Sequence, residues 1–509
     1  MASVYSCVNL IRNQITFNIY THIYLVHIDA LGCFGLIANM HCRDIRSFCD
    51  DGRCFQFFAA LIANLMAISD GMTVGWTAPM IPYFLSEDSH IRMTVIETEW
   101  LETYLLIGAI VGLPLTIYFV DRIGRKKSLL LSSFVLLVAW MMIALADKIE
   151  YIYIARVMSG MGGDMAFVAA PMYIAEIADQ KIRGFLSSVI YLMMLIGVMT
   201  VYTVGPYLPF YVPSIIGGVL LTIELIVFSL LPETPYFLLF RNKIEEAEKS
   251  LIKFRSSSES IKEELREISV AVERQKLERG KPQDIVLVKS YRKAMLIMAV
   301  LNTAQQLSSI NVILMNMHQI LGEAGSIYVH PPIAAIIFAG LMLVAALSAS
   351  CSIDNFGRKK LLVMSSILTS LSLLALAVYF HIKESGLEYR RISWIPIVSV
   401  MVYAAVYKFG LGMVPIVITA EIFASKMKAI GMTIADGVYV SMAICSIQLY
   451  NILKDNLGMH APFYLFSLCA FLTSIFVIFF IPETKGKSLD EIQIILEGKR
   501  VDRSISEVS

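Results

Sequence analysis

The stretch "DRIGRKK" at residues 121–127 returns almost unchanged as "DNFGRKK" at residues 354–360. Two further pairs follow in the same order, namely "PMYIAEIADQKIRG" (171–184) with "PIVITAEIFASKMKAIG" (415–431), and "PETPYF" (232–237) with "PETKGK" (482–487). Three repeats in one order are hard to obtain by chance. They indicate a chain built from two copies of one unit.

The amino-acid composition indicates whether this chain lies in water or in a membrane. Of its 509 residues, 57% are hydrophobic and 16% are charged, and the mean hydropathy is +0.69. A soluble domain needs more polar surface than this. The sequence therefore predicts a membrane protein. The formal net charge of +1 gives no support to a nucleic-acid partner.

Twelve segments are apolar over a length of about 20 residues, which is the length that a helix needs to cross a bilayer. They are 56–76, 99–120, 128–146, 151–175, 186–206, 212–231, 294–319, 333–353, 361–381, 395–421, 429–450 and 462–481. In lipid, backbone N–H and C=O groups must form their hydrogen bonds within the protein. Segments of this length are therefore expected to be helices rather than the short alternating strands of a barrel. We predict an all-α membrane protein with two pseudo-symmetric bundles of six transmembrane helices.

The predicted spans and the polar stretches between them divide the chain into five parts. These are an N-terminal extension of unknown role (1–55), a six-helix bundle (56–240), a helical linker (241–290), a second six-helix bundle (291–482) and a tail (483–509). Within the linker, a helical stripe is predicted from Ile261, Leu265, Ile268 and Val272. A solvated linker with transient helices is the alternative.

Lys and Arg gather in the loops on one side of the predicted spans, including both copies of the repeated basic motif. The positive-inside rule makes that side cytoplasmic. With twelve spans, both chain ends and the linker are then cytoplasmic. The plasma membrane is the default location, because no sorting signal was identified.

From about residue 56 to 492, the chain resembles a sugar porter of the major facilitator superfamily. The resemblance rests on Arg156, Gly160, "PMYIAE", Arg183–Gly184, "PETP", "QQLSSIN" (305–311), "DNFGRKK" and "PETKGKSLDEI". It implies two parallel halves around a sugar site near the middle of the bilayer, reached alternately from each face. "WTAPMIP" (76–82) resembles the insect-type facilitated trehalose and hexose transporters.

The repeated charged motifs are candidates for a cytoplasmic gate in such a carrier. Gly124 and Gly357 permit tight turns, and the lysines after them can meet lipid headgroups or helix C-termini. We expect charged clips to join the two halves when the cavity opens outward and to break when it opens inward. The candidate gate residues are Asp121, Arg125, Arg156, Glu176, Arg183, Asp354, Arg358, Glu421 and Lys428. The alternative is that these charges only fix the orientation in the membrane.

The seventh span carries the strongest binding signal. Gln305 and Asn311 lie within about 120° of one another on a helix, so both can flank one cavity. Their amides both donate and accept hydrogen bonds, which suits a ring of hydroxyl groups. Asn302 fits a role in joining helices instead. Here "QQLSSIN" resembles the family's sugar-contact motif, with Ser309 in place of a glycine.

Other positions depart from the pattern of glucose carriers. Tyr191, Ile416 and Tyr439 replace expected sugar contacts, and Lys408 stands where an acidic residue is common. The candidate substrate-binding residues are Gln305, Gln306, Asn311, Asn316, Tyr191, Lys408, Ile416 and Tyr439. Glucose therefore cannot be assumed as the substrate.

Charges within predicted spans are costly, so each should have a role. We predict that Lys408 pairs with Asp436. Asp70 and Arg156 are candidates for proton coupling, because proton-driven members of the family combine an acid in span one with an arginine in span four. Asp164 is a further charge inside a span.

The favoured function is facilitated diffusion of a sugar, either a hexose or a trehalose-like disaccharide. The alternatives are a proton-coupled sugar symporter and a sugar sensor that binds without transport. The sequence has no P-loop, metal-ligand cluster or nucleophile elbow, so we expect no enzyme activity, cofactor or metal. Oligomeric state stays open.

Overall fold

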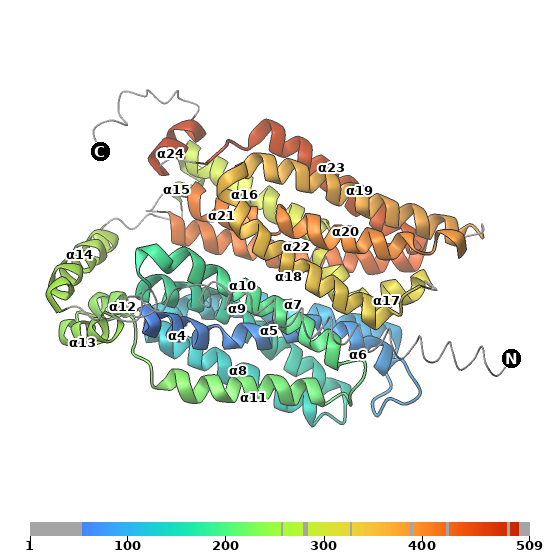
Figure 1. The fold of residues 1–509 in the computed structure, drawn as a ribbon, viewed down its shortest axis with the longest axis horizontal. Coiled ribbons are helices and arrows are strands. Elements are labelled where there is room, and N and C mark those ends of the chain that lie inside the picture. Colours follow the sequence, from blue (N-terminus) through green and yellow to red (C-terminus); the bar gives the residue numbers. More distant parts are fainter. Residues whose placement is uncertain are drawn as a thin grey trace, which may run out of the picture.

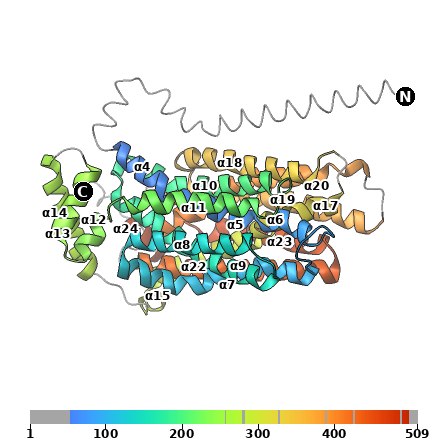
Figure 2. The same cartoon turned by 90° about the horizontal axis from the view of Figure 1, so that it is seen from below.

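The computed structural model describes residues 53–255, 258–277, 283–325, 328–386, 390–423, 427–485 and 489–497. Most of the predicted extension 1–55 therefore lies outside the described residues. The described secondary structure is helical throughout (Figures 1 and 2).

The N-terminal half contains six membrane helices. The first consists of three consecutive pieces, and the others are single helices. In chain order they are α4 (Arg53–Ala63), α5 (Leu65–Gly75) and α6 (Thr77–Phe84), then α7 (Val95–Ile123), α8 (Arg125–Ala144), α9 (Ile149–Ile177), α10 (Gln180–Val204) and α11 (Val212–Ser229). The first helix extends beyond the predicted limit at residue 76. Pro79 permits this because it is the third residue of α6, where a backbone N–H has no partner within the helix.

The C-terminal half repeats this layout. Its first and fourth membrane helices are each broken into two pieces. In chain order they are α16 (Lys289–Leu307) with α17 (Ile310–Ala324), α18 (Pro331–Phe356), α19 (Arg358–Glu384), α20 (Ile395–Phe409) with α21 (Val414–Ile422), α22 (Lys428–Leu457) and α23 (His460–Phe480). The short 3-10 helix η1 (Arg390–Ile392) precedes α20.

Ten stretches of the described residues are long and apolar enough to cross a membrane. The helix α10 adds a shorter apolar part, Val189–Val204. The helix α9 has 29 residues and carries Arg156 and Asp164 among its apolar side chains. These twelve membrane helices are the ones that the sequence predicts.

The two halves lie side by side with their helices running the same way (Figure 1). The largest contacts between them are those of α10 with α18, α7 with α22, and α6 with α17, and α5 also contacts α17. The first two pairs join the fifth helix of one half to the second helix of the other, as expected for halves related by an approximate twofold axis. The interface therefore has the symmetry that the sequence repeats predict.

Short helices cover one end of the bundle, at the left of Figure 1, which we call the linker end. They are α12 (Pro235–Phe240), α13 (Ile244–Phe254), α14 (Ser258–Leu277), α15 (Asp284–Leu287) and α24 (Leu489–Glu497). The predicted stripe on α14 is confirmed, because Ile261, Ile268 and Val272 are buried with Leu265 against α12 and α13. We call the opposite end, where α6 and α17 finish, the far end.

The break between α16 and α17 lies inside the predicted sugar motif. Ser309 has φ 74° and ψ 15°, a left-handed conformation that strains residues with a Cβ by about 1–2 kcal/mol. Its hydroxyl is buried without a hydrogen-bond partner among the described residues. The family's glycine would avoid both costs at this position.

We expect Ser309→Gly to raise the free energy of unfolding by about 1 kcal/mol, after the entropy that glycine adds to the unfolded chain is subtracted. Thermal unfolding in detergent would show this as a higher midpoint. Ser308→Gly is the matched control, because Ser308 has φ −89° and should gain nothing. A midpoint for Ser309→Gly at or below that of the natural protein would contradict the assignment of strain.

Candidate functional site

A charged clip closes the linker end of the N-terminal half. Arg125 forms an ion pair with Glu176 at 2.8 Å between Nη2 and Oε1. The Thr234 hydroxyl donates to the other oxygen of Glu176. Glu233 accepts from the backbone N–H of Lys126 at 3.0 Å, and the Lys126 Nζ donates to the Ser229 carbonyl at the end of α11. Helices α8, α9 and α11 are thereby joined.

The C-terminal half has the same clip, residue for residue. Arg358 pairs with Glu421 at 2.9 Å between Nη2 and Oε1, and the Thr484 hydroxyl donates to Glu421. Glu483 accepts from the backbone N–H groups of Arg358 and Lys359 at 3.0 and 3.1 Å. The Lys359 Nζ donates to the last turn of α23. The three sequence repeats therefore meet in space as one structural unit per half.

The glycine of each repeat allows this contact. Gly124 has φ 101°, and an added Cβ would lie 2.4 Å from Glu233 Oε2. Gly357 has φ 86°, and its added Cβ would lie 2.8 Å from Glu483 Oε2. Burial alone would raise the pKa of Glu483, but the backbone N–H groups around it hold that pKa below its usual range. Burial raises the pKa of Glu233 instead.

The clip includes residues that sequence reasoning missed. These residues are Thr234, Thr484, Glu233 and Glu483. They belong to the repeated "PET" sequences, but no role was predicted for them. Their signal was available, because "PET" follows the last span of both halves. The expectation that lysines after the glycine meet helix C-termini is confirmed for Lys126 and Lys359.

The remaining gate candidates have varied positions. Arg183 donates to the Ala178 carbonyl at 3.5 Å, and Glu176 takes Arg125 rather than Arg183 as its ion-pair partner. Asp121 is exposed, and its backbone carbonyl accepts from Arg241. The side chains of Asp354 and Lys428 lie outside the described part of the chain. Contact of these residues with the opposite half stays a prediction.

Placing Arg156 in a gate at the linker end was wrong. Arg156 lies in the second turn of α9, which starts at the far end. It is fully buried, and it donates to the carbonyls of Leu101 at 3.0 Å and Thr73 at 2.7 Å. Its guanidinium also lies 5.5 Å from the centre of the Trp76 ring. Arg156 therefore ties α9 to the start of α7 and to the junction of α5 with α6.

Three predicted sugar contacts of the C-terminal half come together. The Asn311 amide donates to Gln306 Oε1 at 3.0 Å, and the Tyr439 side chain lies beside Gln306. By distance and angle, Gln306 Nε2 is buried without a hydrogen-bond partner among the described residues, although the Tyr439 hydroxyl is close enough to interact with this amide. Asn311 and Tyr439 are partly exposed. A buried amide donor with no partner costs about 1–3 kcal/mol, so this group suits a ligand that supplies an acceptor.

The N-terminal half contributes Tyr191 to the same place. Tyr191 lies near Tyr439 and Asp436 of the other half, and its ring centre is 6.0 Å from that of Phe167. The group formed by Gln306, Asn311, Tyr439 and Tyr191, which we call the central polar group, is therefore shared between the halves.

Gln305 and Asn302 stabilise the C-terminal half. Gln305 Nε2 donates at 2.8 Å to the Leu411 carbonyl, which the break between α20 and α21 leaves free. Asn302 donates at 2.6 Å to the Ala435 carbonyl of α22, which confirms its predicted role in joining helices. Ile416 is partly buried on α21. A sugar contact by Gln305 or Ile416 stays a prediction.

Asn316 lies in a contact between the halves. Its amide donates to Glu102 Oε2 of α7 at 3.1 Å. Asn316 itself has a non-helical φ of −110° within α17. Glu102 was missed by sequence reasoning, although a glutamate inside a predicted span is a signal. Only 1% of the Glu102 surface is exposed, so this contact is buried between the halves.

Two further contacts join the halves at the far end. Lys454 Nζ forms an ion pair with Glu99 Oε1 at 2.8 Å. Gln448 Nε2 donates to the Thr103 hydroxyl at 2.8 Å. Together with Asn316 and Glu102, these residues form what we call the far-end seal. The Tyr202 hydroxyl of α10 also donates across the interface, to the Leu314 carbonyl of α17.

The predicted pairing of Lys408 with Asp436 was wrong. Asp436 lies within hydrogen-bonding reach of Asp164 on α9 of the other half. Asp164 also accepts from Thr116 at 2.8 Å. The reason is topological, because α20, which ends near Lys408, packs on α18 and α19 rather than on α22. A sugar contact by Lys408, which is partly buried, stays a prediction.

Asp70 lies on α5 close to α9. Its carboxylate leaves no space for a Cβ on Gly163, which would approach Oδ1 to 2.1 Å. Arg156 and Asp164 are both near enough to interact with it electrostatically. Three acids, Asp70, Asp164 and Asp436, therefore lie close together beside the interface of the halves.

Comparison with known proteins gives a consistent result. A family model described as "Sugar (and other) transporter" matches residues 56–496. A facilitated trehalose transporter of Bombyx mori is 29% identical over 456 residues, which are 89% of each chain. That of Apis mellifera ligustica is 29% identical over 444 residues, 86% of this chain and 87% of the relative.

Solved structures show the same fold. The inward open conformation of the xylose transporter XylE from E. coli superimposes with a TM-score of 0.71 at 21% identity. The match covers 86% of this chain and 99% of that one. The likeness confirms the predicted arrangement of two six-helix halves.

We expect Thr234→Val and Thr484→Val to destabilise the protein equally, by about 1.5 kcal/mol each, because each removes a hydrogen bond to a half-buried carboxylate. Thermal unfolding in detergent measures the loss. Thr222→Val is the matched control, since Thr222 is exposed and bonds only within its own helix. A large effect in one half and none in the other would contradict the equivalence of the two clips.

Proposed function

Because the chain belongs to the sugar (and other) transporter family, we propose that it carries a sugar across the membrane by alternating access. Transport down a gradient requires no cofactor. The sugar's own gradient sets the direction of net flux, while rocking of the two halves exposes the central polar group to each face in turn.

One observation carries this proposal at the level of residues. The amide donor of Gln306 is buried, has no partner by distance and angle among the described residues, and lies beside Asn311 and Tyr439. Tyr191 of the other half is close enough to Tyr439 to interact with it electrostatically. A sugar hydroxyl would accept from Gln306 while tyrosine rings cover the apolar faces of the sugar ring. Because both halves contribute residues, the binding site is complete only when the two halves close around the substrate.

The substrate class follows from the relatives and the site. Both reported relatives carry names of facilitated trehalose transporters. Amides and tyrosine hydroxyls suit a neutral polyhydroxylated ligand, and the central polar group offers no fixed cation for an anionic sugar. We propose a hexose or a disaccharide of the trehalose type.

The contacts between the halves identify the state of the carrier. The far-end seal is formed, and each charged clip lies within its own half. If the linker end is cytoplasmic, as the loop charges indicate, this state is closed to the outside. Both chain ends would then be cytoplasmic, and the plasma membrane is the proposed location.

We expect purified protein in proteoliposomes to take up at least one of labelled trehalose, glucose, fructose and inositol. Gln306→Ala should lower the initial rate about tenfold or more, because the partner of a substrate hydroxyl is lost. Asn456→Ala is the matched control, since this exposed amide bonds only to Ile452 of its own helix.

Two outcomes would contradict this proposal. Saturable binding of a sugar without any uptake would indicate a sensor instead of a carrier. Uptake that is equal in Gln306→Ala and the natural protein would remove the central polar group from the site.

Proton-coupled transport is the second candidate, and the three clustered acids favour it. Two carboxyl groups as close as Asp164 and Asp436 repel one another when both are ionised. A proton shared between them would join the halves near the centre. Facilitated diffusion remains the preferred function, because both reported relatives carry names of facilitated transporters.

For a facilitated carrier, we expect an inward proton gradient across pH-clamped vesicles to leave uptake unchanged. No sugar should accumulate above its external concentration. Accumulation that disappears in Asp70→Asn or Asp436→Asn would show symport. Asp147→Asn is the matched control, because Asp147 is exposed in a loop.

A further inference from the structure

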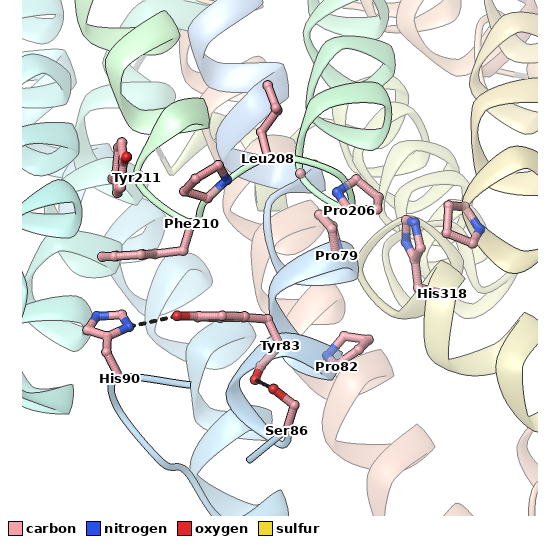
Figure 3. Close-up of a pocket in the computed structure, with 13 residues that line it drawn as sticks. Pro79, Pro82, Tyr83, Ser86, His90, Pro206, Leu208, Phe210, Tyr211 and His318 are labelled. Atoms are coloured by element: carbon pink, nitrogen blue, oxygen red, sulfur yellow. Dashed lines mark hydrogen bonds between the residues drawn. The ribbon is translucent and has the colours of Figure 1, made fainter. Parts of the chain in front are cut away.

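A cavity of about 610 Å³ lies near the far end, away from the central polar group. Figure 3 shows its lining side chains. The N-terminal half contributes the end of α6, the loop after it and the segment between α10 and α11. The C-terminal half contributes His318 of α17 and Pro332 at the start of α18. The cavity is therefore shared between the halves.

Rings dominate the lining. Five prolines take part, and they are Pro79, Pro82, Pro206, Pro209 and Pro332. Tyr83 and Phe210 stack in parallel, with ring centres 6.0 Å apart and an angle of 4° between the planes. His90 lies 4.0 Å from Phe210 and bonds to the Tyr83 hydroxyl at 3.0 Å. These contacts hold the three rings of Tyr83, His90 and Phe210, which we call the aromatic wall, in place before any ligand arrives.

His318 is the unusual polar group of this cavity. Only 6% of its surface is exposed, and neither ring nitrogen has a hydrogen-bond partner among the described residues. Its ring meets that of Tyr202 edge to face at 5.6 Å. A neutral imidazole has one donor and one acceptor nitrogen. A hydroxyl group placed beside His318 in this cavity would satisfy one of these nitrogens.

We propose that this cavity is a second binding site, for an uncharged aromatic compound with one hydroxyl group. The aromatic wall and the prolines would cover the faces of the ring, and the hydroxyl would bond to His318. A sugar fits less well, because most of its hydroxyl groups would leave water without finding partners among these apolar side chains.

Ligand binding here would favour one state of the protein. His318 and Pro332 belong to one half, whereas the aromatic wall belongs to the other. Separation of the halves at the far end would take the lining apart. A ligand that binds only the assembled lining stabilises the state in which the far-end seal is formed.

The test uses 4-fluorophenol as the probe and the full chain in lipid nanodiscs. Fluorine NMR should show a saturable change in the probe signal that empty nanodiscs lack. His318→Leu should weaken binding about two- to tenfold, the range expected for one hydrogen bond. Leu208→Trp should abolish it, because Leu208 lines the cavity and the larger ring would fill the space.

Two controls separate this site from others. His381→Leu removes a histidine of the far end that does not line the cavity, and binding should not change. Gln306→Ala should also bind normally, whether or not the protein transports sugar. Equal saturable binding in the natural protein, His318→Leu and Leu208→Trp would overturn the proposal, as would a signal no different from that of empty nanodiscs.

Discussion

The structure depends on polar contacts between the two bundles that close the far end. Glu99 and Glu102 are carboxylates within a membrane interior, where an unpaired charge is costly. Lys454 and Asn316 of the opposite half provide their partners at 2.8 and 3.1 Å. Opening this end would remove those partners, and water would have to replace them. The closed far end is therefore favoured unless water enters from this side and hydrates the separated polar groups.

Within each half, the contacts are of a different kind. The clips join three helices through an arginine, two glutamates and a threonine, and both copies use the same residue types. Each clip is formed inside its own half and does not itself join the halves in this state. Clips between the halves in the outward-open state stay a prediction. This arrangement suits a carrier that rocks as two rigid bodies around a central polar group.

Sequence periodicity and repeats were sufficient for the twelve membrane helices and the twofold layout, since hydrophobic length and repetition are local properties. Pairing between helices was harder. Asp436 was assigned to Lys408, yet the rotation of α22 directs it toward Asp164. The predicted position of Arg156 at the linker end was also wrong, because its depth in the membrane depends on where α9 begins. Thr484 was missed since a threonine after a span looks ordinary until Glu421 lies beside it.

The most direct measurement of this account uses pairs of spin labels in lipid bilayers. One pair replaces Lys127 and Lys360 at the linker end, and the other replaces Asp147 and Asn456 at the far end, all exposed positions. Loss of the far-end ion pair in Glu99→Gln should lengthen the far-end distance and shorten the linker-end distance together. A far-end change with no change at the linker end would contradict rocking of two rigid halves.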